Sequence, residues 1–162
     1  MPHSRLLLLA GGPAGDTELA DKFAVHGIDP ARIEIAGRRP RQAYLELHNR
    51  LDVALDPFPF NGDNTLCDAL LMGVPTVTLA GDTFVSRRGV SHLNNVGMGE
   101  LVAASLDVYI TKAVALAQDI PRLISLRPLL RQLLMTSPLT DATVFIGQLE
   151  KTYCWMWRRW SE

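Results

Sequence analysis

The segment LDPFPFNGDNTLCDALLMG, Leu55–Gly73, decides how this chain folds. A short apolar run ends at Leu55, and the two prolines after it cannot lie inside a helix because they lack the N–H group. The four residues NGDN are typical of a turn. From Thr65 onward apolar residues recur at helical spacing up to Gly73, a residue that readily ends helices. The segment therefore predicts a strand, a rigid turn and the N-terminus of a helix.

The first turn of this predicted helix is a candidate anion site. Backbone N–H groups are unpaired at a helix N-terminus, and the helix dipole is positive there. In nucleotide-binding α/β domains the anion at such a place is usually a phosphate. Thr65 and Asp68 also have the spacing of a capping box, in which side chains satisfy those N–H groups. Spacing alone leaves a phosphate site and an ordinary helix cap as open alternatives.

Strands and helices alternate along the first half of the chain. The pattern predicts strands at residues 6–9, 33–35, 51–55 and 75–79, and helices at about 16–26, from Pro40 and from Thr65. Such alternation is typical of a parallel sheet with helices on both faces. The continuous apolar run at 6–9 predicts a strand buried on both faces. Ligands bind beyond the carboxyl ends of parallel strands, so we expect loops 37–41, 60–65 and 81–87 to converge on one crevice.

The second half of the chain is predicted to be mostly helical. Expected helices cover residues 91–96, 106–117, 120–134 and about 141–160, with a last short strand at 101–102. Pro128 should kink or restart the third of these helices. One helix face cannot bury Trp155, Trp157 and Trp160 together, so we expect this aromatic surface to be exposed or covered by another chain.

Composition excludes several classes of protein. A chain of 162 residues with 48% apolar residues fits one folded domain, and the net charge of −1 gives no reason to expect nucleic-acid or membrane partners. No apolar run has membrane-spanning length. The two cysteines, Cys67 and Cys154, are too few for a disulfide framework or a zinc site, which favours a cytoplasmic location.

A specific resemblance begins at LDPFPFNG and continues through GVPTVTLAGD, VGMGELVA, SLRPLLRQLLMTSPLTD and QLEKTYCWMWRRW. These motifs resemble the C-terminal catalytic lobe of bacterial O-linked N-acetylglucosamine transferases, the SPINDLY-like family. The likeness covers nearly the whole chain, from about Ser4 to Trp160. It implies an α/β fold: a Rossmann-like three-layer α/β/α lobe with a parallel sheet at residues 1–139, half of a GT-B glycosyltransferase, followed by a crossing helix at 140–162.

The resemblance also implies an activity. The family transfers N-acetylglucosamine from UDP-N-acetylglucosamine to Ser or Thr of proteins, with inversion and without a metal or other cofactor. The N-terminal lobe and the tetratricopeptide repeats are expected to be absent here, so we expect a fragment or truncated product that is inactive alone and holds no catalytic residue. The acceptor protein would bind through the missing region, and the tryptophan-rich helix would form a homodimer.

Three residues of the segment GRRPRQAY match the family's uridine-binding positions. By resemblance, the Arg39 backbone faces the uracil edge, Arg41 lies over the uridine, and the Tyr44 ring stacks nearby. Two other functions remain open: a GT-B enzyme with a different donor or acceptor, since fold does not determine substrate, and a non-catalytic interaction module that uses its tryptophan-rich helix.

The phosphate turn of the family falls on Asp63, Asn64 and Thr65. The resemblance implies that Thr65 meets the β-phosphate with its hydroxyl and N–H, that Asn64 offers its N–H, and that Asp68 accepts from the ribose hydroxyls. Asp63 departs from the family, and two like charges about 4 Å apart interact by roughly 4 kcal/mol. We therefore expect weakened donor binding, or an Asp63 side chain that points to solvent.

Three further side chains receive structural roles. Arg87 is expected to support a loop rather than the pocket. His92 has no metal-ligand partner at the required spacing and is expected to be a packing or surface histidine. Cys67 falls on an apolar helix face and is expected to be inert.

Overall fold

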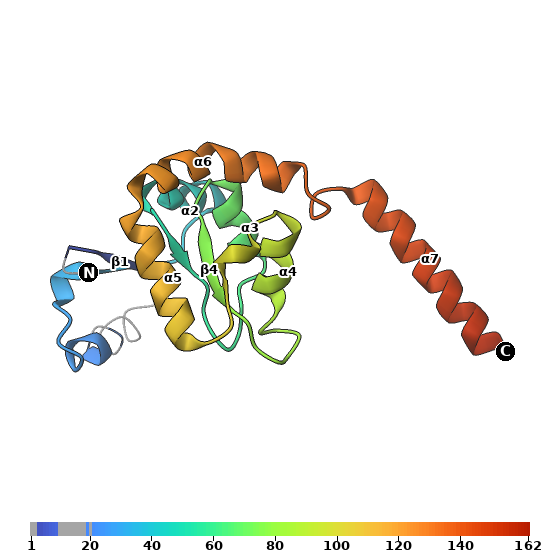
Figure 1. The fold of residues 1–162 in the computed structure, drawn as a ribbon, viewed down its shortest axis with the longest axis horizontal. Coiled ribbons are helices and arrows are strands. Elements are labelled where there is room, and N and C mark those ends of the chain that lie inside the picture. Colours follow the sequence, from blue (N-terminus) through green and yellow to red (C-terminus); the bar gives the residue numbers. More distant parts are fainter. Residues whose placement is uncertain (1–2, 10–18, 20) are drawn as a thin grey trace. The chain divides into compact units, whose positions relative to one another are not determined.

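The computed structural model describes residues 3–9, 19 and 21–162 (Figure 1). The chain forms two compact units, Met1–Leu51 and Asp52–Glu162, and each is described by itself. All strand pairs in both units are parallel among the described residues, so the predicted α/β class with parallel strands is confirmed. The predicted boundary between a lobe at 1–139 and a helix at 140–162 remains a prediction.

The first unit contains a two-stranded parallel sheet. Strand β1 (Leu6–Leu9) pairs with β2 (Ile33–Ala36), and α2 (Arg41–Leu47) begins directly after Pro40, as predicted. Two short 3₁₀ helices, η1 (Pro30–Arg32) and η2 (His48–Arg50), complete its described elements. The predicted burial of β1 on both faces is wrong: Leu9 is 49% exposed and the other three residues are partly exposed, because in the described part of the unit β1 pairs with β2 alone. The helix predicted at 16–26 starts outside the described residues, and 21–24 are helical.

The second unit is built around strand β4 (Thr76–Leu79), whose four residues are all buried, as the run PTVTL predicts. It pairs with β3 (Ala54–Leu55) on one side and β5 (Val102–Ala103) on the other. Strand β3 is shorter than the predicted 51–55. A 3₁₀ helix, η3 (Gly99–Leu101), leads into β5.

Four helices enclose this sheet. They are α3 (Asn64–Leu71), α4 (Arg88–Asn95), α5 (Leu106–Gln118) and α6 (Ile120–Met135). Helices α3, α4 and α5 pack against β4, and α6 packs on α3 and α5 (Figure 1). Helix α4 begins three residues before the predicted 91–96, a difference that places Arg88 at its first position.

The core of the second unit lies between the sheet and these helices. Leu70 of α3, Leu93 of α4 and Leu130 of α6 are fully buried in one apolar cluster. Helix α6 continues through Pro128, so the predicted restart does not occur. The buried side chains of Leu126 and Leu130 on either side anchor the helix in the core and offset the hydrogen bond that the proline removes.

The final helix, α7 (Ala142–Ser161), begins where the sequence predicted. Asp141 caps it by accepting a hydrogen bond from the Val144 N–H (2.9 Å). None of its residues is buried, and the three tryptophans are 59–78% exposed, so the predicted exposed aromatic surface is confirmed. No helix among the described residues combines the length and apolar character needed to cross a membrane.

Candidate functional site

The turn between β3 and α3 is organised by a buried carboxylate. Asp56 is 4% exposed, and its two oxygens accept from the Gly62 N–H (2.7 Å) and the Thr78 hydroxyl of β4 (2.6 Å). Burial raises the pKa of Asp56 above its usual value, and these hydrogen bonds oppose that shift. The Tyr109 hydroxyl of α5 donates to the Asp56 carbonyl (3.0 Å), and burial raises the pKa of Tyr109 to about 12. The start of the turn is thus fixed by both β4 and α5.

A second buried side chain fixes the middle of the turn. Asn61 is fully buried, and its side-chain amide donates to the Pro57 carbonyl (3.1 Å). Its backbone N–H donates to the Val85 carbonyl (3.1 Å), so the predicted loops 60–65 and 81–87 do meet. Loop 37–41 belongs to the other unit, and its convergence stays a prediction.

Position 62 needs a glycine for a steric reason rather than a conformational one. In the described chain positive φ occurs only at glycines 27, 73 and 97, so the turn does not use the left-handed region. A Cβ on Gly62 would run into the Thr65 hydroxyl. The missing side chain therefore leaves space beside that hydroxyl.

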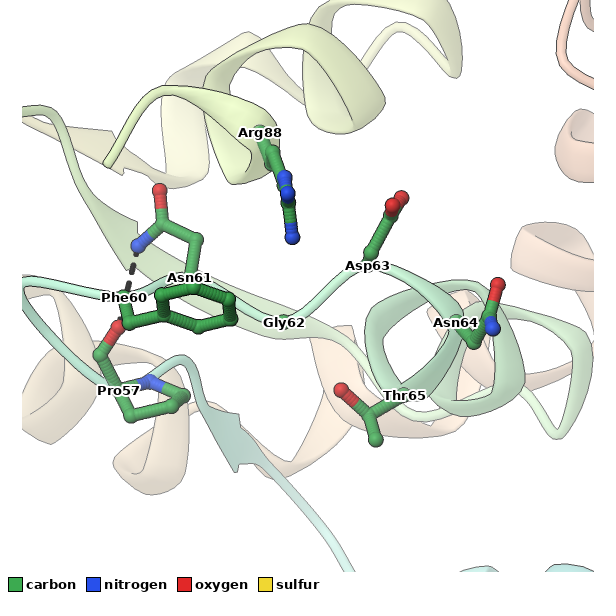
Figure 2. Close-up of a pocket in the computed structure, with 8 residues that line it drawn as sticks. All are labelled: Pro57, Phe60, Asn61, Gly62, Asp63, Asn64, Thr65 and Arg88. Atoms are coloured by element: carbon green, nitrogen blue, oxygen red, sulfur yellow. Dashed lines mark hydrogen bonds between the residues drawn. The ribbon is translucent and has the colours of Figure 1, made fainter. Parts of the chain in front are cut away.

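The turn and the start of α3 line an open hollow of about 320 Å³ (Figure 2). Its lining consists of Pro57, Phe60, Asn61, Gly62, Asp63, Asn64, Thr65 and Arg88. The first intrahelical bond of α3 runs from the Cys67 N–H to the Asp63 carbonyl (3.1 Å). The N–H groups of residues 64–66 precede this bond and have no acceptor within the helix.

Of the two alternatives that the spacing left open, the capping box at Thr65 and Asp68 does not form. Helix α3 starts at Asn64, so Asp63 is the N-cap and Thr65 lies inside the first turn. The Asp63 side chain accepts no hydrogen bond from the helix, because its carboxylate is directed to a histidine of α4. The N-terminal amides of α3 therefore have no side-chain cap, which favours the anion site over the ordinary cap.

Asp63 forms an ion pair with His92. The distance from Asp63 Oδ1 to His92 Nε2 is 3.1 Å, and His92 Nδ1 lies 2.6 Å from the Arg88 carbonyl. The Cys67 side chain, the Arg88 carbonyl and the Asp63 charge together raise the pKa of His92 to about 9, against the opposing effect of burial. At neutral pH the imidazolium therefore neutralises Asp63. The predicted repulsion between Asp63 and a diphosphate stays a prediction, and the interpretation of His92 as a packing or surface histidine missed this ion pair.

This ion pair predicts a pH dependence of stability. Because the pKa of folded His92 is raised to about 9, its stabilising contribution is complete below the unfolded pKa of about 6.5 and is lost as the pH rises through 9. The free energy of unfolding should fall by on the order of 3 kcal/mol between about pH 6 and pH 10. Urea unfolding at both pH values measures this change. The His92→Gln variant should lose most of this pH dependence. An equal pH dependence of the free energy of unfolding in the variant would show that His92 does not cause it.

The other predicted binding residues occupy different places. Asp68 lies on α3, is 6% exposed and does not line the hollow. Arg39, Arg41 and Tyr44 belong to the first unit, where the Arg41 guanidinium lies 5.9 Å from the centre of the Tyr44 ring. Their roles toward a uridine remain predictions.

Two arginines at the start of α4 differ in their surroundings. Arg87 donates from its guanidinium to the Gly81 carbonyl (3.1 Å), which confirms its predicted support of the loop. Arg88 lines the hollow instead, and the sequence analysis missed it. The only signal was the adjacent pair of arginines, which does not show which of them faces the turn.

No group of three or more His, Cys, Asp and Glu side chains within the described residues is arranged to hold a metal ion. The polar lining of the hollow combines the first N–H groups of α3, the Thr65 hydroxyl, the Asn64 side chain and the Arg88 guanidinium with the carboxylate of Asp63. The N–H groups, the hydroxyl and the guanidinium are hydrogen-bond donors, which suits an anionic ligand, and the Asp63 carboxylate is paired with His92.

Comparison with known proteins gives the family of this chain. Residues 1–149 match the family described as Glycosyl transferase family 41. The chain is 36% identical over its full length to a protein of Petunia hybrida named probable UDP-N-acetylglucosamine–peptide N-acetylglucosaminyltransferase SPINDLY. It is 44% identical to the protein of the same name from Eustoma exaltatum over 74% of its length.

The same comparison extends to solved structures. A mutant of the Thermobaculum terrenum O-GlcNAc transferase superposes with a TM-score of 0.91 and 36% identity over 98% of this chain. The chain spans 18% of the petunia protein, 13% of the Eustoma protein and 31% of the solved chain.

Proposed function

Because the chain belongs to glycosyl transferase family 41, we propose that it is the UDP-sugar-binding part of a protein O-N-acetylglucosamine transferase. The observation that carries this proposal is the hollow at the start of α3, where the N–H groups of residues 64–66 lack a side-chain cap. The names of the relatives supply the donor, UDP-N-acetylglucosamine, and a peptide acceptor.

In this proposal the chain acts on the leaving group. The α3 N–H groups and the Thr65 hydroxyl bind the diphosphate and stabilise the negative charge that develops on it as the sugar bond breaks. Asn64 contributes its N–H, and Asp68 accepts from the ribose hydroxyls. The transfer proceeds with inversion and without a metal. Both cysteines are free, which fits the cytoplasmic location that we propose.

Binding of UDP by the whole chain tests the proposal. Calorimetric titration should show UDP binding more tightly than uridine, because only UDP carries the diphosphate. Thr65→Val should weaken UDP binding by about 10-fold, the effect of one hydrogen bond to a charged group, while Thr65→Ser keeps the hydroxyl and should bind normally. Equal affinities for UDP and uridine would contradict a diphosphate site.

We also propose that α7 joins two copies of the chain. Its exposed apolar residues include Phe145, Ile146, Trp157 and Trp160, and the rings of the last two lie 5.3 Å apart. A contiguous aromatic surface of this kind favours association.

Sedimentation velocity over a range of concentrations measures this association. The unmodified chain should form a dimer, and the double substitution Trp157→Ser and Trp160→Ser should give a monomer. Ile124→Ser changes an exposed residue of α6 that is 69% accessible and should leave the dimer intact. A monomer at all concentrations of the unmodified chain would contradict the proposal.

A further inference from the structure

Arg88 lies at the mouth of the hollow with no polar partner of its own. Its Nε atom is buried without a hydrogen-bond acceptor. The guanidinium carbon lies 5.1 Å from the centre of the Phe60 ring and 5.2 Å from that of Phe84. Two aromatic rings thus hold the cation by cation–π contact, which keeps its position but gives the buried Nε–H no acceptor.

The nearest acidic side chain in the hollow is already engaged. Asp63 pairs with His92 at 3.1 Å, and across the described chain no ion pair or side-chain hydrogen bond is recorded for Arg88. Asp56 lies behind the turn, where its oxygens accept from Gly62 and Thr78. A buried donor without an acceptor is unfavourable, and a ligand that supplies one removes that cost.

The Arg88 side chain extends so that its positive charge lies opposite the N-terminus of α3. Figure 2 shows Arg88 extending from α4 toward the segment that carries Asn61, Gly62 and Asp63. A second polar group in the same lining also lacks a partner: Asn61 is fully buried, and its Oδ1 accepts no hydrogen bond. Because Asn61 is fully buried, the groups that the hollow offers to a ligand are the Arg88 guanidinium and the first N–H groups of α3, which are donors suited to an anion.

We propose that Arg88 is a substrate-binding residue that grips the diphosphate of the sugar nucleotide from the side opposite the α3 amides. This inference rests on the proposed function, since it names a further ligand of the same diphosphate. A planar guanidinium can donate two parallel hydrogen bonds to phosphate oxygens, and its charge opposes that of the diphosphate. Phe60 and Phe84 keep the guanidinium in place before the ligand arrives, which reduces the entropy lost on binding.

The test compares ligands that differ only in the diphosphate. UDP and uridine are titrated calorimetrically into the full chain, unmodified and with Arg88→Ala, Arg88→Lys or Arg131→Ala. Arg131 is exposed on α6, so its replacement removes the same charge outside the hollow. Near-ultraviolet circular dichroism monitors folding, and Arg88→Gln, which keeps the apolar stem, replaces the alanine variant if that variant does not fold.

We expect Arg88→Ala to weaken UDP binding by about 10-fold or more and to leave uridine binding unchanged. Arg88→Lys should retain part of the UDP affinity, and Arg131→Ala should retain all of it. An equal loss for UDP and uridine would assign Arg88 a merely structural role and overturn the inference. Unchanged UDP binding in Arg88→Ala would overturn it while the proposed function stands, whereas no UDP binding by the unmodified chain would overturn both.

Discussion

Replacement of Asp56 by alanine should lower the free energy of unfolding by about 3 kcal/mol and abolish UDP binding. Asp56 is 4% exposed and is the acceptor for both the Gly62 N–H and the Thr78 hydroxyl. The substitution leaves two donors in the interior without a partner, each at a cost of about 1–3 kcal/mol. It also frees the turn that positions the first residues of α3, so the anion site loses its geometry.

Two further variants separate these effects. Asp56→Asn keeps an oxygen for Gly62 and offers an amide to the Thr78 hydroxyl, so it should be intermediate in stability and in UDP affinity. Asp52→Ala removes an exposed carboxylate that precedes β3, at the opposite end of the strand from Asp56, and should change neither. Urea unfolding and calorimetric titration measure both quantities. An Asp56→Ala protein as stable as Asp52→Ala would show that the buried carboxylate does not organise the turn.

Leu70→Ala should destabilise the second unit by about 3 kcal/mol, within the range measured for leucine truncation in protein cores. Leu70 is fully buried on α3 and belongs to the cluster that joins α3 to α6. The variant loses apolar burial and leaves a cavity that rigid neighbours cannot fill. Since the same helix presents the candidate anion site, its UDP affinity should fall as α3 becomes more mobile.

The matched control lies on the facing helix. Leu129→Ala truncates a leucine of α6 that is 41% exposed, so it should cost less than about 1 kcal/mol. Thermal unfolding of both variants measures how much each substitution destabilises the protein. Equal destabilisation by the two substitutions would show that the α3–α6 contact is not the centre of the core.

Much of the fold follows from local sequence signals. Helix α3 ends before Gly73, whose φ is +76°, and β4 coincides with the run PTVTL. Helix α7 was predicted from its cap at Asp141 and its apolar spacing. These elements depend on periodicity and on residues with special backbone preferences, which are properties of short segments.

The start of α4 could not be predicted in this way. Gly89 is its second residue, and glycine normally argues against a helix. A Cβ at Gly89 would collide with the side chains of Thr78 and Asp56, so the glycine allows α4 to approach β4 closely. That requirement arises from tertiary packing and leaves no periodic signal in the sequence.

In the candidate site, too, features with local sequence signals were predicted and features that depend on tertiary contacts were not. The turn and the helix start that forms the candidate anion site were predicted, because prolines and turn residues mark them locally. The ion pair of Asp63 with His92 and the position of Arg88 at the hollow were missed, since each joins α3 or its turn to α4. The capping box failed for a related reason: the N-cap of the helix is Asp63, two residues before the Thr65 that the motif suggested.

The most direct test of a diphosphate site at the start of α3 is a nuclear magnetic resonance titration of the ¹⁵N-labelled chain with UDP. We expect the largest chemical-shift changes at the backbone amides of Asn64, Thr65 and Leu66 and at the Arg88 Nε–H, and we expect uridine to leave these resonances nearly unchanged. Resonances at these four positions that do not move at saturating UDP, while others do, would contradict this expectation.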